Sequence, residues 1–124
     1  RTLYWNYGRI SGVAEILALL STGGLAWRLR KRRHKAFPLT ISAAACLAAA
    51  HAAFWRWVSP VNRTMVTWPL DSIPSDWSGW RDQWEYTHAA RAVLVTAALT
   101  ALVYSLAEES AGRHHLEPEM MRAF

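Results

Sequence analysis

The amino-acid sequence predicts an all-α fold, an integral membrane helical bundle with three transmembrane helices. The first observation is that three long segments rich in alanine and leucine divide the 124-residue chain. The second is that tryptophans stand at the ends of these segments, where their amphipathic rings anchor a helix at a membrane surface. The third is that six of the 14 basic residues fall within residues 28–35. A soluble, alanine-rich helical bundle is the alternative fold.

Three segments have the length and composition of membrane spans, because crossing a bilayer core of about 30 Å takes roughly 20 mostly apolar residues in a helix. They are residues 10–27, residues 39–58, which follow Pro38 at a helix start, and residues 89–107. Small residues are frequent in all three and favour close packing of neighbouring helices. The length suits a single membrane domain over residues 1–124.

The basic residues indicate how the chain is oriented in the membrane. Short loops rich in lysine and arginine stay on the cytoplasmic side, so the 28–37 loop is predicted to be cytoplasmic and to touch anionic lipid. The N-terminus and an outer loop over residues 59–87 then lie outside, and a polar tail over residues 108–124 is cytoplasmic. A bias toward alanine and arginine is typical of bacteria and places the protein in a bacterial inner membrane.

The net charge of +5 does not indicate a nucleic-acid partner, because most of it lies in that one loop. One cysteine excludes an intrachain disulfide framework and a cysteine-rich zinc site. Common catalytic motifs are absent and no cofactor is predicted, although His51 and His88 could ligate haem or a metal from facing helices. His114 and His115 could also bind a metal, but a solvated tail is the preferred interpretation.

The chain begins at Arg1 without a methionine, and residues 3–7 have the composition of an interfacial aromatic belt. We therefore expect a further segment upstream of Arg1.

The region before the third span contains a striped helix. Pro74 followed by Ser75 or Asp76 is typical of a helix N-cap, so a helix is expected to start near residue 76 and continue into the membrane. Spacings of 4, 3, 4 and 3 residues place five side chains on one face of it: Trp77, Arg81, Trp84, His88 and Arg91. Alternating aromatic and cationic groups favour cation–π stacking, or a lining for a planar, polar molecule.

Ionisable groups inside spans are expensive and mark either function or a buried pair. A helical rise of about 1.5 Å per residue places Glu15 roughly 8 Å and His51 roughly 10 Å below the outer ends of their spans. His88 and Arg91 lie near the same surface, so the four side chains are expected to share one polar pocket, capped by residues 62–84. Two alternatives stay open: Glu15 forms a structural ion pair with Arg91, or His51 is a hydrogen-bonded packing histidine shielded by Trp55.

The region from Pro60 to Arg91 resembles the anthrone-oxygenase-like family of small integral membrane proteins. The resemblance extends to Glu15 and the residues 9–12 before it. Its main motif comprises Pro60-Val61-Asn62, Trp68, Pro74-Ser75-Asp76-Trp77, Arg81, Trp84, His88 and Arg91. It implies a four-helix membrane bundle, of which the first helix would precede Arg1. Fungal members are linked to the oxidation of anthrones to anthraquinones by oxygen without an obvious cofactor.

The functional hypothesis is that the protein binds or oxidises a hydrophobic, aromatic or quinone-like small molecule. His88 would act as the general base and Arg91 would stabilise the resulting oxyanion. The remaining candidates would bind the substrate: Asn62 and Arg81 by orienting it, Trp77 and Trp84 by stacking, Glu15 and His51 as a polar floor, and Trp68 by the resemblance. The alternative is a non-catalytic accessory subunit of a larger respiratory or photosynthetic membrane complex.

Overall fold

The computed structural model describes the backbone of residues 2–69 and 71–122 and the side chains of residues 10–69 and 71–110. Within these residues the chain is helical without any strand, which confirms the all-α fold. The side chains of residues 3–7, His114 and His115 lie outside the described residues. The elements are α1 (Thr2–Lys31), α2 (Phe37–Ala53), the π-helical turn η1 (Phe54–Val58), α3 (Ser59–Val66) and α4 (Trp77–Arg122).

Three stretches of helix are long and apolar enough to cross a membrane, as predicted: Ile10–Lys31, Phe37–Val66 and Trp77–Ser110. Each contains one of the spans expected from the sequence. Large apolar side chains on α1 and α4, such as Leu20 and Leu99, are more than half exposed. Such exposure suits contact with lipid chains, and the protein is accordingly an integral membrane protein.

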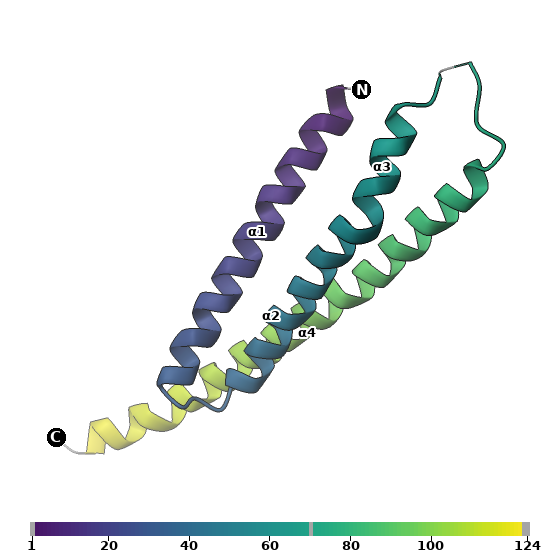
Figure 1. Ribbon diagram of the computed structural model, residues 1–124. Helices are drawn as coiled ribbons and strands as arrows, with labels where there is room; N and C mark the ends of the chain where they lie inside the picture. The colour runs from purple at the N-terminus through teal and green to yellow at the C-terminus, as the bar shows by residue number, and fades with distance from the viewer. Residues whose placement is uncertain (1, 70, 123–124) are drawn as a thin grey trace.

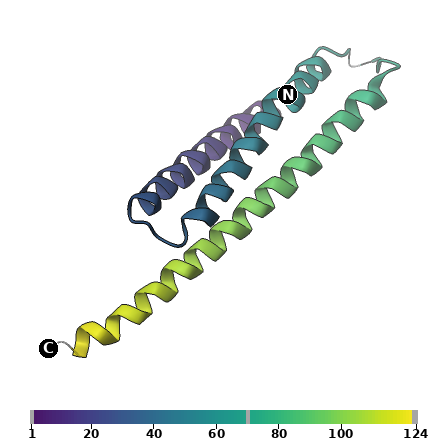
Figure 2. The ribbon, with the colours of Figure 1, turned by 60° about the horizontal axis from the view of Figure 1, so that its bottom comes forward.

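Helix α2 packs against both α1 and α4, and the long helices run antiparallel to their neighbours (Figure 1). The N-terminal end of α1 therefore lies at the same end of the bundle as α3 and the start of α4. Figure 2 shows α4 continuing well past the turn between α1 and α2. The polar tail predicted over residues 108–124 continues the last helix, since residues 108–122 belong to α4. The good helix formers among them can add to an existing helix without a new nucleation step.

The core between the helices consists mainly of alanine, as the frequency of small residues predicts. The buried apolar residues include Ala26, Ala36, Ala43, Ala50, Val58, Val61 and Ala98. Small side chains let helix backbones approach closely and gain dispersion contacts. The buried hydroxyls of Thr40 on α2 and Ser105 on α4 are hydrogen-bonded to each other at 2.7 Å. This bond satisfies two polar groups that would otherwise be costly in an apolar interior.

Helix α1 ends in a Schellman motif. The His34 N–H donates to the Leu29 carbonyl at 3.0 Å, and the Arg33 N–H donates to the Arg30 carbonyl at 3.1 Å. Arg33 has a φ of 49°, in the left-handed region where this motif usually has glycine. The short turn that follows is tied to α4 by an ion pair between Lys35 and Glu108 at 3.2 Å.

The sequence predicts an outer loop over residues 59–87 in which a helix starts near residue 76. The start of α4 at Trp77 agrees with this, whereas residues 59–66 form the helix α3. Pro60 would normally break a helix because its ring clashes with the carbonyl four residues earlier. Here the Ser59 N–H bonds to the carbonyl of Phe54, five residues back, and this wider π turn lets the helix continue. Gln83 of α4 donates to the Trp57 carbonyl at 3.0 Å.

Candidate functional site

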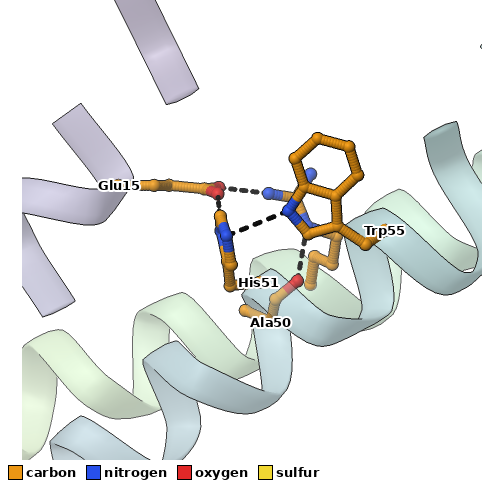
Figure 3. A network of polar contacts seen from close by, with 5 residues as sticks. Glu15, Ala50, His51 and Trp55 are labelled. Atoms are coloured by element: carbon orange, nitrogen blue, oxygen red, sulfur yellow. Dashed lines mark hydrogen bonds and ion pairs between the residues drawn. The ribbon is translucent and has the colours of Figure 1, made fainter. Parts of the chain in front are cut away.

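Charged and polar side chains from three helices meet in one cluster, drawn in Figure 3. Glu15 comes from α1, His51 from α2 and Arg91 from α4. Arg91 Nη2 donates to Glu15 Oε1 in an ion pair, and Arg91 Nε donates to the Ala50 carbonyl at 3.0 Å. His51 Nδ1 lies 3.1 Å from Glu15 Oε2. The structure thus confirms the ion pair between Glu15 and Arg91, and we call this group the ion-pair cluster.

The hydrogen bonds of His51 define its protonation. Trp55 Nε1–H is 3.0 Å from His51 Nε2, and an indole nitrogen can only donate (Figure 3). His51 Nε2 must therefore accept, which leaves the proton on Nδ1, where it is donated to Glu15. His51 is neutral in this arrangement. It is the hydrogen-bonded packing histidine shielded by Trp55 that the sequence left open.

The ion-pair cluster carries no net charge. One carboxylate and one guanidinium cancel, and the neutral imidazole adds no charge. The Arg91 side chain is 14% exposed and that of Glu15 is 32% exposed. The Phe54 ring lies 5.1 Å from the Arg91 guanidinium carbon and covers it further. The cluster joins three helices, and loss of either charged partner would leave the other charge uncompensated in apolar surroundings.

A second cluster lies one helical turn away on α4. The rings of Trp84 and His88 are stacked with centroids 3.8 Å apart. Trp84 Nε1 donates to Asn62 Oδ1 of α3 at 3.1 Å, which fixes the indole against the neighbouring helix. His88 Nδ1 lies 2.8 Å from the Trp84 carbonyl, which can only accept, so Nδ1 carries a proton. The neutral His88 ring then presents an Nε2 lone pair, and we call this group the stacked cluster.

The first turns of α4 carry the remaining candidates. The Arg81 guanidinium lies 4.9 Å from the centroid of the Trp77 ring, which confirms the predicted cation–π stacking. Arg81 also pairs with Asp82 at 3.3 Å and Glu85 at 3.6 Å, and all three of these side chains are about half exposed. Trp68 follows α3, is half-buried and belongs to neither cluster.

The sequence did not point to two groups of the ion-pair cluster, the Ala50 carbonyl and Phe54, or to the bond from Gln83 to the Trp57 carbonyl. Phe54 lies three residues after His51, so helical spacing could have placed it on the same face. The carbonyls of Ala50 and Trp57 could not be found in this way. The Trp57 carbonyl lies in the π turn, for which Pro60 is the sequence signal.

The arrangement bears on the metal and haem hypothesis through His51. Both ring nitrogens of His51 are hydrogen-bonded, so ligation through Nε2 would first require displacement of Trp55. Over residues 10–69 and 71–110, no three histidine, cysteine or acidic side chains gather as a metal site would require. Cys46 is a half-buried free thiol.

A groove of about 670 Å³ lies along α4, and its lining includes no residue of either cluster. It is lined by apolar and hydroxyl side chains: Leu39, Ala92, Val93, Thr96, Ala97, Thr100, Ala101 and Tyr104.

Fold and site together define an integral membrane protein of three long helices, locked by an internal ion pair and carrying an aromatic–histidine stack at one end. Comparison of the chain with protein-family models, with curated proteins and with solved structures found no match.

Proposed function

We propose that the protein binds a hydrophobic aromatic or quinone-like molecule at the stacked cluster and oxidises it, as the resemblance to anthrone oxygenases implies. The observation that carries this proposal is the state of His88. Its Nδ1 proton is held by the Trp84 carbonyl, so in the neutral form of this half-buried ring the basic lone pair is on Nε2. The stack on Trp84 orients this lone pair, and the bond from Trp84 to Asn62 orients the stack. An oriented imidazole near neutral pH is well suited to general-base catalysis.

The reaction would use the acidity of a C–H bond between aromatic rings. His88 Nε2 would take that proton and leave an enolate. Molecular oxygen would accept electrons from the enolate and add at the same carbon. Loss of water from the resulting peroxide gives the quinone, so that anthrone and oxygen yield anthraquinone and water. The flat indoles of Trp77 and Trp84 would hold the planar substrate.

The positive charge that stabilises the enolate oxygen is assigned to Arg81 rather than Arg91. Arg91 is engaged by Glu15 and the Ala50 carbonyl, and its withdrawal would break the ion-pair cluster. The pairs of Arg81 with Asp82 and Glu85 are exposed and cost little to exchange for a substrate oxygen. Arg91, Glu15 and His51 then act as positioning residues that set where α4 lies.

Replacement of His88 tests the proposal directly. Membranes containing His88→Ala should oxidise an anthrone at least about 100-fold more slowly than the unaltered protein, the usual contribution of a general base. Thr87→Ala is the matched control, because the Thr87 hydroxyl bonds only back to the Gln83 carbonyl of its own helix. An unchanged rate in His88→Ala would end the general-base assignment.

We further propose that the protein lies in a bacterial inner membrane with residues 28–37, the end of α1 and the turn after it, in the cytoplasm. The six basic residues of this segment support the orientation, as do the acidic residues that follow α3. Ser72→Cys should react with a membrane-impermeant thiol reagent in intact cells. Labelling that occurs only after lysis would show that the orientation is the opposite one.

The alternative function, a non-catalytic accessory subunit of a larger membrane complex, is favoured by the groove along α4. Alanine and threonine at its floor would let the backbone of a partner helix approach closely. Purification in mild detergent separates the two functions. An accessory subunit should leave the membrane with stoichiometric partner chains and show no anthrone oxidation, whereas the proposed oxygenase should be active as the isolated chain.

A further inference from the structure

A second groove lies between α1 and α2, at the opposite end of the bundle from the stacked cluster, and we call it the α1–α2 groove. Its volume is about 140 Å³. Gly23, Ala26, Trp27 and Arg30 on α1 have the spacing of one helix face, and Phe37 and Ile41 on α2 form the other wall. Five of the six lining residues are apolar. The sixth, Arg30, lies in the last turn of α1, so the groove runs from a charge into apolar surroundings.

The groove opens beside a concentration of positive charge. Lys35 is paired with Glu108, and Lys31 lies 5.0 Å from the centroid of the Trp27 ring. Arg30, Arg32 and Arg33 are exposed and form no ion pair within the described side chains. The protein itself therefore leaves several guanidinium groups uncompensated at this end.

The backbone at Arg33 points in the same direction. Its φ of 49° is one that glycine adopts without cost and that other residues adopt reluctantly. An arginine at this position retains a charge where the turn alone would favour glycine. The turn is thus better explained by a need for charge than by backbone geometry.

We propose that this groove binds one anionic phospholipid. The phosphate would be held by Arg30, and one acyl chain would lie between α1 and α2 along Gly23, Ala26 and Ile41. Uncompensated guanidinium groups supply the complementary charge for the phosphate. The apolar walls belong to stretches long and apolar enough to span a membrane, which fits an acyl chain and does not fit a free phosphate. The exposed Trp27 ring suits the level of the headgroups.

The experiment compares two pairs of matched variants. Arg30→Gln removes the charge at the groove, and Arg32→Gln removes the same charge outside it. Gly23→Leu fills the groove, and Gly24→Leu makes the same change outside its lining. No atom outside their own helix backbone lies within 4 Å of a Cβ built at either glycine, so a side chain can start at both positions without a backbone clash. Retained lipid is measured by native mass spectrometry of the whole chain in detergent, with added dioleoylphosphatidylglycerol or dioleoylphosphatidylcholine.

The unaltered protein should retain one phosphatidylglycerol in preference to phosphatidylcholine. Arg30→Gln should weaken phosphatidylglycerol binding about fivefold, the contribution of one basic residue at an anionic surface. Gly23→Leu should weaken the binding of that lipid too, while Arg32→Gln and Gly24→Leu leave it unchanged. Equal losses in Arg30→Gln and Arg32→Gln would show diffuse charge attraction and overturn the proposal. So would an unaffected Gly23→Leu, equal retention of the two lipids, or displacement of the lipid by millimolar inorganic phosphate.

Discussion

The ion-pair cluster and the stacked cluster lie on the same face of α4, yet their hydrogen bonds leave different groups available. In the ion-pair cluster, Glu15 accepts hydrogen bonds from Arg91 and His51, and Nε2 of His51 accepts one from Trp55. In the stacked cluster, the hydrogen bonds of Trp84 and His88 do not use the Nε2 atom of His88. The first cluster uses its polar groups to join helices, and the second holds one group ready for another molecule.

This difference shows why charge inside a membrane protein is not in itself a sign of chemistry. Glu15, His51 and Arg91 include the most costly groups to place among apolar helices, and for that reason they satisfy one another. His88 carries no obligatory charge and can keep an open acceptor at a small cost. Substitutions that affect stability in one cluster and activity in the other would establish the division.

The largest effect on stability is expected from Glu15→Gln. It leaves the mostly buried Arg91 guanidinium without its carboxylate, at a cost of about 3 kcal/mol, the lower end for a buried pair because Glu15 is one-third exposed. Glu108→Gln is the matched control, since its pair with Lys35 is exposed and is worth less than about 1 kcal/mol. The measurement is the free energy of unfolding in mixed micelles, followed by circular dichroism as dodecyl sulfate is added.

The double variant Glu15→Gln with Arg91→Gln sharpens this result. It removes both charges and should recover most of the stability lost in Glu15→Gln alone, because the cost arises from an unpaired charge. A loss in Glu15→Gln no greater than in Glu108→Gln would mean that the ion-pair cluster does not lock the helices.

The sequence brings the members of the ion-pair cluster to one side of the membrane because depth depends on distance along a helix. A rise of about 1.5 Å per residue places Glu15 roughly 8 Å below the outer end of its span and Arg91 near the same surface, so an ion pair between them is one of the alternatives that the sequence offers. The three spans follow from length and apolar composition in the same way. These features depend only on distances along the chain, which can be counted from the sequence.

The sequence does not predict the parts that depend on helix rotation and backbone geometry. The sequence predicts a loop from residue 59 onward, whereas the π turn before Pro60 widens the helix and lets it continue into α3. The role of Arg91 is a similar case. Its spacing on the striped face suggests contact with a substrate. In the structure Arg91 donates to the Ala50 carbonyl instead, and this bond depends on how α2 is rotated toward α4.

A smaller effect on stability is expected from Trp55→Phe. The aromatic ring is kept, but the donor to His51 Nε2 is lost, at a cost of about 1 kcal/mol for one hydrogen bond. Trp57→Phe is the control, because the Trp57 indole contacts the Arg56 guanidinium through its ring, 5.5 Å from the centroid. The same unfolding measurement applies. Equal stability of the two variants would show that the Trp55 bond does not support the cluster.

The smallest effect on stability, and the one that separates the clusters most clearly, is expected from Asn62→Ala. Trp84 is exposed enough for water to replace the lost amide, so unfolding should change by less than about 0.5 kcal/mol. Anthrone oxidation should nevertheless fall about tenfold, because a freed indole no longer fixes the His88 ring, and small displacements of a catalytic group are costly. Gln83→Ala is the control, since it breaks another bond between α4 and the preceding helix without touching the stack. A variant that loses stability and activity together would place Asn62 among the residues that hold the helices. The two clusters would then form one structural unit rather than a lock and an open site.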